Sequence, residues 1–276
     1  MGNMRVSRSM VCVVLTVGAV FLSGCSKVAR CPAEFLNEPP VTQAPWVSGP
    51  SAEAFLKAAG SGKNFYVYLK SRKGNESKFR KAFEAALRKM GDRAESASVD
   101  IENKAESTLV EKYRLQQAPM PLVLAFAPNG AMVGGFPRER ITEDSLAGTV
   151  VSPCLRRCLR ALQEGKLVFV CAASADPKDG KVMIPKGVVD FNKDPQYQSK
   201  MTIITVDPAD PAEQKCLSML QIAPTTKLST ALLAPPGSLV SNWTGPVKKK
   251  ELEAALTKLL SGGGCCGGGA CPPAKK

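Results

Sequence analysis

The chain repeats itself at a spacing of about 100 residues, and this repeat limits the fold more than any other feature of the sequence. Residues 127–133 (APNGAMV) are matched in register by residues 234–240 (APPGSLV). Earlier in each half, Val99-Asp100 is echoed by Val206-Asp207. A repeat of this length corresponds to a whole domain, so we expect two tandem domains of one fold, at 51–150 and 151–260.

Each half alternates strand and helix signals. In the first half, apolar and β-branched runs predict strands at 64–69, 97–101, 122–127 and 132–136, and apolar faces predict helices at 52–59, 78–90, 105–113 and 143–150. In the second half the signals predict a helix at 153–162, strands at 167–172 and 201–206, and a closing helix at 251–260. We therefore expect an α/β fold in which each domain has a central mixed sheet flanked by helices.

The element order βαβαββ followed by a helix resembles the thioredoxin fold. Residues 67–73 stand where thioredoxins have the core strand that leads into their CxxC motif, and residues 113–130 are similar to the segment around the family's cis-proline. Residues 220–225 are similar to the same segment in the second half, with an insertion at 226–230. The resemblance implies cis-prolines at Pro121 and Pro224, in turns that can pair with an extended peptide.

The resemblance also implies a pair of active-site cysteines in each domain, and the sequence has none there. Tyr68 and Phe169 occupy the place of the family's buried proton-relaying Asp. A serine hydroxyl cannot replace a thiolate, because it is neutral at pH 7 and forms no disulfide. We therefore predict no catalytic residue at the family's CxxC positions, which are Gly74, Ser77, Ala175 and Lys178.

The N-terminus has the features of a bacterial lipoprotein signal. Arg5 and Arg8 precede an apolar run at 10–21, which is too short to span a bilayer as a helix. Residues 22–25 (LSGC) resemble a lipobox, which implies cleavage after residue 24 and a diacylglyceryl group on Cys25. The alternative is an ordinary signal peptide cut nearby. Residues 25–50 contain five prolines and predict an extended tether.

Composition excludes several classes of function. The chain has no histidine, so it has no Ser-His-Asp triad, no Cys-His protease pair and no HExxH zinc site. The formal charge is +13, but the export signal argues against a nucleic-acid partner and favours a basic surface beside an anionic membrane. Ser26, after the lipidated cysteine, is similar to lipoproteins sorted to the outer membrane.

Cys154 and Cys158 lie one turn apart on a predicted helix that Ser152 caps. The helix dipole, Arg156 and Arg157 are expected to favour the Cys154 thiolate, so the pair can be oxidised or can bind a soft metal ion. The alternative is a pair of unlinked structural thiols. Cys171 and Cys216 lie in apolar stretches and are expected to be small buried hydrophobes.

The C-terminal segment 261–276 has too much glycine to pack and is predicted to be disordered. It carries three cysteines that can bind Cu(I) or Zn(II), or form disulfides with each other or with the helical pair: Cys265, Cys266 and Cys271.

These features together predict a lipid-anchored envelope protein without a required cofactor. Its two degenerate thioredoxin-like domains would bind or scaffold extended protein segments without turnover. A second hypothesis is a thiol-disulfide or Cu/Zn-handling protein that uses Cys154, Cys158 and the tail cysteines. A third is a purely structural envelope component.

Overall fold

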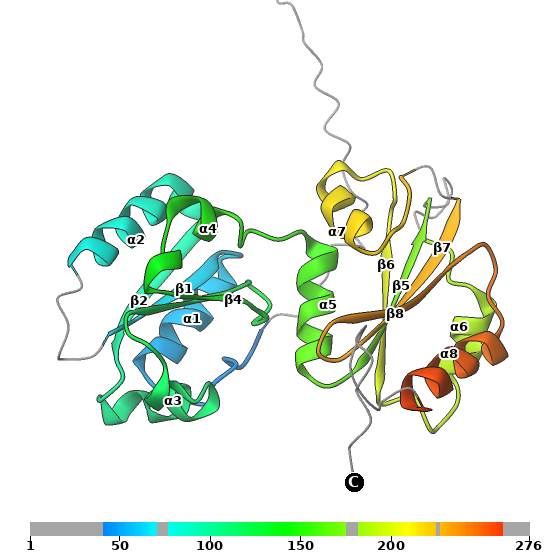
Figure 1. Ribbon diagram of the computed structural model, residues 1–276, viewed down its shortest axis with the longest axis horizontal. Helices are drawn as coiled ribbons and strands as arrows, with labels where there is room; N and C mark the ends of the chain where they lie inside the picture. Colours follow the sequence, from blue (N-terminus) through cyan, green and yellow to red (C-terminus); the bar gives the residue numbers. More distant parts are fainter. Residues whose placement is uncertain (1–40, 71–76, 175–181, 225–226, 262–276) are drawn as a thin grey trace, which may run out of the picture. The chain divides into compact units, whose positions relative to one another are not determined.

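A computed structural model describes residues 41–70, 77–174, 182–224 and 227–261 of the 276-residue chain. The described part contains two four-stranded sheets, each with helices on both faces (Figure 1). The signal peptide, Cys25 and the tail beyond Ser261 lie outside the described residues. The helices and strands are α1 Pro50–Gly60, β1 Asn64–Lys70, α2 Ser77–Met90, β2 Ala94–Asp100, α3 Ser107–Lys112, β3 Leu122–Phe126, β4 Met132–Pro137, α4 Glu143–Ala147, α5 Pro153–Gln163, β5 Leu167–Ala173, α6 Lys186–Asn192, β6 Met201–Val206, α7 Gln214–Met219, β7 Leu228–Ala234, β8 Ser238–Thr244 and α8 Lys249–Ser261.

The first sheet has the strand order β2-β1-β3-β4. Strand β1 pairs in parallel with β2 and antiparallel with β3, so it is central and buried on both faces. Its side chains alternate. Phe65, Val67 and Leu69 pack with α1 and α3, whereas Tyr66 and Tyr68 pack with α2 and α4 on the other face.

The second sheet has the same arrangement, β6-β5-β7-β8, with β5 at the centre. Val168 and Val170 face α5 and α7, and Phe169 and Cys171 face α6 and α8. The buried, β-branched composition of β5 favours a strand that is covered on both faces. Helix α6 has no counterpart among the elements predicted from sequence.

Both halves therefore have the thioredoxin-like topology that the sequence predicts. In each, a parallel βαβ unit precedes an antiparallel β-hairpin that pairs with the first strand, and a closing helix follows. The parallel connection needs a crossover helix, which α2 and α6 provide. The expected α/β class with two tandem mixed sheets is confirmed.

The first domain begins earlier than the predicted boundary at residue 51. Trp46, within the predicted tether, is fully buried in the core. Its ring centroid lies 5.6 Å from that of Phe55 and 5.0 Å from that of Phe126. Proline content predicts an extended segment but does not show that an aromatic side chain within it fills a core. At least the segment around Trp46 therefore belongs to the folded domain.

The helices cover the sheets and are short. The longest among the described residues is α2, with 14 residues. Within the described ranges, no helix combines the length and the apolar character that crossing a bilayer requires.

Replacing Trp46 with alanine should destabilise the first domain. The change leaves a cavity among aromatic rings, so the free energy of unfolding should fall by about 3–5 kcal/mol. Urea unfolding of the full chain, followed by circular dichroism, measures this loss. Val47→Ala is the matched control, because Val47 is 93% exposed. Equal stability of the two variants would show that Trp46 is not part of the core.

Candidate functional site

The family's active-site position in the first domain contains no sulfur. Ser77 is the first residue of α2, and Gly74 lies outside the described residues. Tyr68 on β1 is buried beneath this helix and packs against Phe83, with ring centroids 5.2 Å apart. The place of the family's buried acid is therefore filled by an aromatic pair.

The second domain has the same substitution at a displaced helix. Ala175 and Lys178 lie outside the described residues, and α6 begins later, at Lys186. Spacing from β5 alone did not locate this helix, because the connection is longer than in the first domain. Phe169 packs against Phe191 of α6, with ring centroids 5.4 Å apart. No cysteine lies in the described residues just before α6.

One of the two predicted cis-prolines is correct. The Met120–Pro121 peptide is cis, and Pro121 directly precedes β3. The prediction for Pro224 is wrong, because the Ala223–Pro224 peptide is not cis; among the described residues of the second domain, the cis bond is Pro235–Pro236, between β7 and β8. Pro224 lies four residues before β7, so it need not turn the chain directly into the strand, and the trans form is the intrinsically favoured one.

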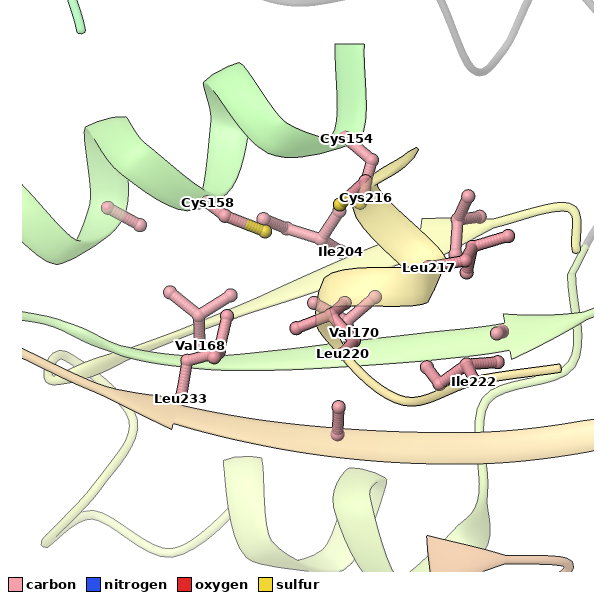
Figure 2. Packing of buried hydrophobic residues seen from close by; sticks show 14 of the residues in the cluster. Cys154, Cys158, Val168, Val170, Ile204, Cys216, Leu217, Leu220, Ile222 and Leu233 are labelled. Carbon is pink, nitrogen blue, oxygen red and sulfur yellow. The ribbon is translucent and has the colours of Figure 1, made fainter. Parts of the chain in front are cut away.

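A cluster of three cysteines lies between α5 and α7 in the second domain. Ser152 caps α5 by accepting a hydrogen bond from the Leu155 amide. This cap places Cys154 in the first turn and Cys158 one turn later, both facing the core. Cys216 on α7 completes the cluster, and Figure 2 shows the three side chains converging. None of them is in a disulfide.

A buried carboxylate lies beside these thiols. Glu213 is 4% exposed and precedes α7. Its Oε1 accepts a hydrogen bond from the Cys154 amide at 2.9 Å. The Ser152 hydroxyl also interacts with this carboxyl group, but no donor among the described residues meets hydrogen-bond geometry at Oε2. Burial raises the pKa of Glu213, and the interaction with Ser152 opposes this rise. The ligand atoms of Cys154, Glu213 and Cys216 all lie within 4.8 Å of one another.

The three thiols influence one another's pKa values. Hydrogen bonds donated by Cys154 and Cys158 lower the pKa of Cys216. Hydrogen bonding to the other two sulfurs and burial raise the pKa of Cys154, so the predicted stabilisation of its thiolate by the helix dipole is wrong. For Cys158, a hydrogen bond with Cys154 and the charge of Arg157 favour the thiolate, but donation to Cys216 and burial outweigh them and raise the pKa.

The first domain has the same framework without the thiols. The Ser51 amide donates to Oε1 of Glu106 at 2.9 Å, as the Cys154 amide does to Glu213. The two positions also match in sequence. Ser51 lies 14 positions before Phe65, the first buried residue of β1, and Cys154 lies 14 positions before Val168, the first buried residue of β5. By this register the counterparts of the three cysteines are Ser51, Phe55 and Leu109.

The remaining predicted sites have different outcomes. Cys171 is a buried hydrophobe, as expected, on the opposite face of β5 from the cluster. Cys216 is also buried, but it joins Cys154 and Cys158, which the sequence prediction missed. The signal was available in the repeat. Cys216 follows Glu213 by three positions, as Leu109 follows Glu106, so the second domain has a cysteine where the first has a leucine. The tail positions Cys265, Cys266 and Cys271 lie outside the described residues.

No family model matches this chain, and no curated protein matches it. Among solved structures, human ERp44 aligns at 13% identity over 74% of this chain and 54% of its own, with a TM-score of 0.32. The first two thioredoxin domains of Saccharomyces cerevisiae Eps1p align at 9% identity over 75% of this chain and 96% of theirs, with a TM-score of 0.25. The germline-specific thioredoxin Deadhead of Drosophila melanogaster aligns at 17% identity over 34% of this chain and 82% of its own, with a TM-score of 0.27. These similarities are distant, and the fold assignment depends on the strand order described above.

The buried thiols should react slowly in the native protein. Burial raises the pKa of Cys171 from 9.0 to about 12, which lowers its thiolate fraction about 1000-fold at neutral pH. We expect alkylation of Cys154, Cys158 and Cys171 by iodoacetamide to be at least about 100-fold slower in buffer than in urea. Peptide mass spectrometry of the reduced full chain measures each rate. Rapid native labelling of Cys154 would support the reactive thiolate predicted from sequence.

Proposed function

We propose that this protein is a membrane-anchored lipoprotein whose thioredoxin-like domains bind extended protein segments without thiol-disulfide turnover. The observation that carries the proposal is the aromatic pair beneath the first helix after the central strand in both domains. Tyr68 with Phe83, and Phe169 with Phe191, occupy the place where the family keeps a proton-relaying acid. A dithiol exchange site needs both a thiolate and a proton acceptor, and the sequence has no cysteine at the predicted positions.

The first domain also has a sheet edge that is suited to binding an extended peptide. Strand β2 is at the edge of its sheet and pairs only with β1 among the described strands. Ser96 and Ser98 lie opposite Tyr66 and Tyr68 in the register, so they share the α2 face of the sheet. An edge strand of this kind offers unpaired backbone groups to an added strand.

A small hollow beside this edge can accept one side chain of the added strand. It has a volume of about 90 Å³. Ser96 and Ser98 of β2 and Leu87 of α2 line it, together with Tyr68 and Phe83. Backbone pairing along β2 would provide affinity, and the hollow would provide selectivity for the side chain that enters it.

The N-terminal signal supports the location within the proposal. Cleavage before Cys25 and lipidation of its thiol would anchor the chain on the outer side of the inner membrane or, given Ser26, on the outer membrane. The formal charge of +13 would favour contact with anionic lipid headgroups. The partners are thus the membrane and extended protein segments.

The chain should not reduce disulfides. With dithiothreitol as electron donor, the full chain in detergent should precipitate insulin no faster than dithiothreitol alone, because no described cysteine is exposed. Turbidity measures the rate, and the double variant Cys154→Ser/Cys158→Ser is the control. Robust reduction that disappears in the double variant would overturn the proposal in favour of thiol exchange.

Filling the hollow should weaken peptide binding. Fluorescently labelled, unstructured peptides of varied sequence, measured by anisotropy, should bind the full chain, and Ser98→Trp should weaken this binding about tenfold or more. Lys81→Trp is the matched control, since Lys81 is exposed on α2 and does not line the hollow. Absence of binding to the unchanged chain, or equal affinity of Ser98→Trp, would contradict binding at β2.

A further inference from the structure

We propose that the second domain holds a buried zinc site formed by the thiolates of Cys154, Cys158 and Cys216 and the carboxylate of Glu213. The site is separate from the peptide-binding surface, which belongs to the first domain. The inference depends on the packing between α5 and α7, and it does not require the proposed function.

The separations are close to those that a tetrahedral metal ion requires. With Zn–S bonds of about 2.3 Å, neighbouring ligand atoms of a tetrahedral site lie about 3.8 Å apart. The ligand atoms of Cys154, Glu213 and Cys216 already lie within 4.8 Å of one another. Cys158 lies one helical turn from Cys154 on the same buried face of α5 and in the same core cluster, which makes it the fourth ligand of the proposal. Because its sulfur is outside the group of three ligand atoms that already lie together, binding would require a change of the Cys158 rotamer.

The types of ligand select the metal. Thiolates bind soft or borderline ions such as Cu(I) and Zn(II), and they exclude Mg(II) and Ca(II). A carboxylate oxygen as the fourth ligand suits tetrahedral Zn(II), which accepts sulfur and oxygen together. Cu(I) prefers sulfur ligands and would leave Glu213 without a role. The set of three sulfurs and one oxygen therefore favours zinc.

Metal binding would also provide the missing partner of Glu213. Its Oε2 is buried and accepts no hydrogen bond among the described residues. An unsatisfied buried carboxylate oxygen is costly, and a bound cation removes that cost. Each thiol that binds would release its proton to solvent. Arg157, whose charge acts on Cys158, would partly balance the negative charge of the ligands.

The first domain shows that the fold does not need these thiols. At the equivalent positions, the Ser51 hydroxyl donates a hydrogen bond to Oε2 of Glu106, and Phe55 and Leu109 are apolar core residues. The glutamate is thus fully paired in one domain and partly unpaired in the other. Three cysteines stand where the first domain has a serine, a phenylalanine and a leucine. Core packing alone does not explain why two of these sulfurs lie beside one buried carboxylate.

The surrounding shell would hold the ion in a dry site. Apolar residues of the same cluster pack around the thiols, among them Val168, Val170, Ile204 and Leu217 (Figure 2). Such a shell limits solvent access to the metal and strengthens its bonds to thiolates. Because the ligands come from α5, from α7 and from the residue before α7, bound zinc would stabilise the second domain against unfolding.

Zinc titration of the reduced full chain tests the site. The three tail cysteines are first replaced by serine, so that Cys265, Cys266 and Cys271 do not contribute. Competition against a chromophoric chelator should then show one tightly held zinc ion per chain. Co(II) in its place should give the intense thiolate-to-metal charge-transfer absorption of a multi-thiolate site. Zinc should also raise the midpoint of thermal unfolding.

Single variants on this background separate ligands from packing. Cys216→Leu introduces the residue type that the first domain has at the equivalent position, Leu109. It should abolish the charge-transfer band and weaken zinc binding at least about 100-fold. Glu213→Gln keeps an acceptor for the Cys154 amide but should weaken zinc binding about tenfold or more. Cys171→Ser is the matched control, because this buried cysteine lies on the other face of β5.

Two results would overturn the zinc site. One is equal zinc affinity in the Cys216→Leu variant and its parent. The other is a disulfide between any two cluster cysteines in protein isolated from its own cells, shown by a non-reducing peptide map. A circular dichroism spectrum of each variant establishes that it folds. If Cys216→Leu does not fold, Cys158→Ser is measured in its place by the same two spectroscopic tests.

Discussion

The structure of each domain depends on one hydrogen bond between a helix N-terminus and a buried glutamate. The amide in the first turn of α1 or α5 donates to Glu106 or Glu213 at the same distance, 2.9 Å. This bond satisfies a backbone donor that the helix itself cannot satisfy. It also connects the first helix of the domain to the short helix that follows the second strand, so it joins two of the elements that cover one face of the sheet.

The two domains use this shared framework differently. In the first domain, the Ser51 hydroxyl and an aromatic cluster around Trp46 complete the face, and all polar atoms of Glu106 are used. In the second domain, three thiols take these places and leave one carboxylate oxygen unpaired. On the other face of each sheet, both domains have an aromatic pair, Tyr68 with Phe83 and Phe169 with Phe191. In the second domain the thiol cluster and the aromatic pair therefore lie on opposite faces of the sheet.

The sequence predicted part of this site and missed the rest for a physical reason. Cys154 and Cys158 are one helical turn apart, so their common face follows from local periodicity. Cys216 and Glu213 come about 60 residues later along the chain. Their approach to α5 depends on how two helices pack on a sheet, which periodicity does not describe. The same limit applies to the charge of Cys154, because a helix dipole favours a thiolate only where burial and neighbouring thiols do not oppose it.

The sequence by itself determined the fold class, the repeat of one domain and the absence of cysteine from the expected active-site positions. These features are local, or they recur at a fixed spacing, so composition and pattern suffice to read them. The cis bond before Pro121 came from the resemblance to thioredoxins, which indicated the wrong proline in the second domain. Only the tertiary structure decided that Trp46 belongs to the first core, that α6 begins at Lys186, and that Cys216 joins Cys154 and Cys158 in the second core, beside Glu213. Such contacts join residues distant along the chain, and their geometry is set by the packing of whole elements.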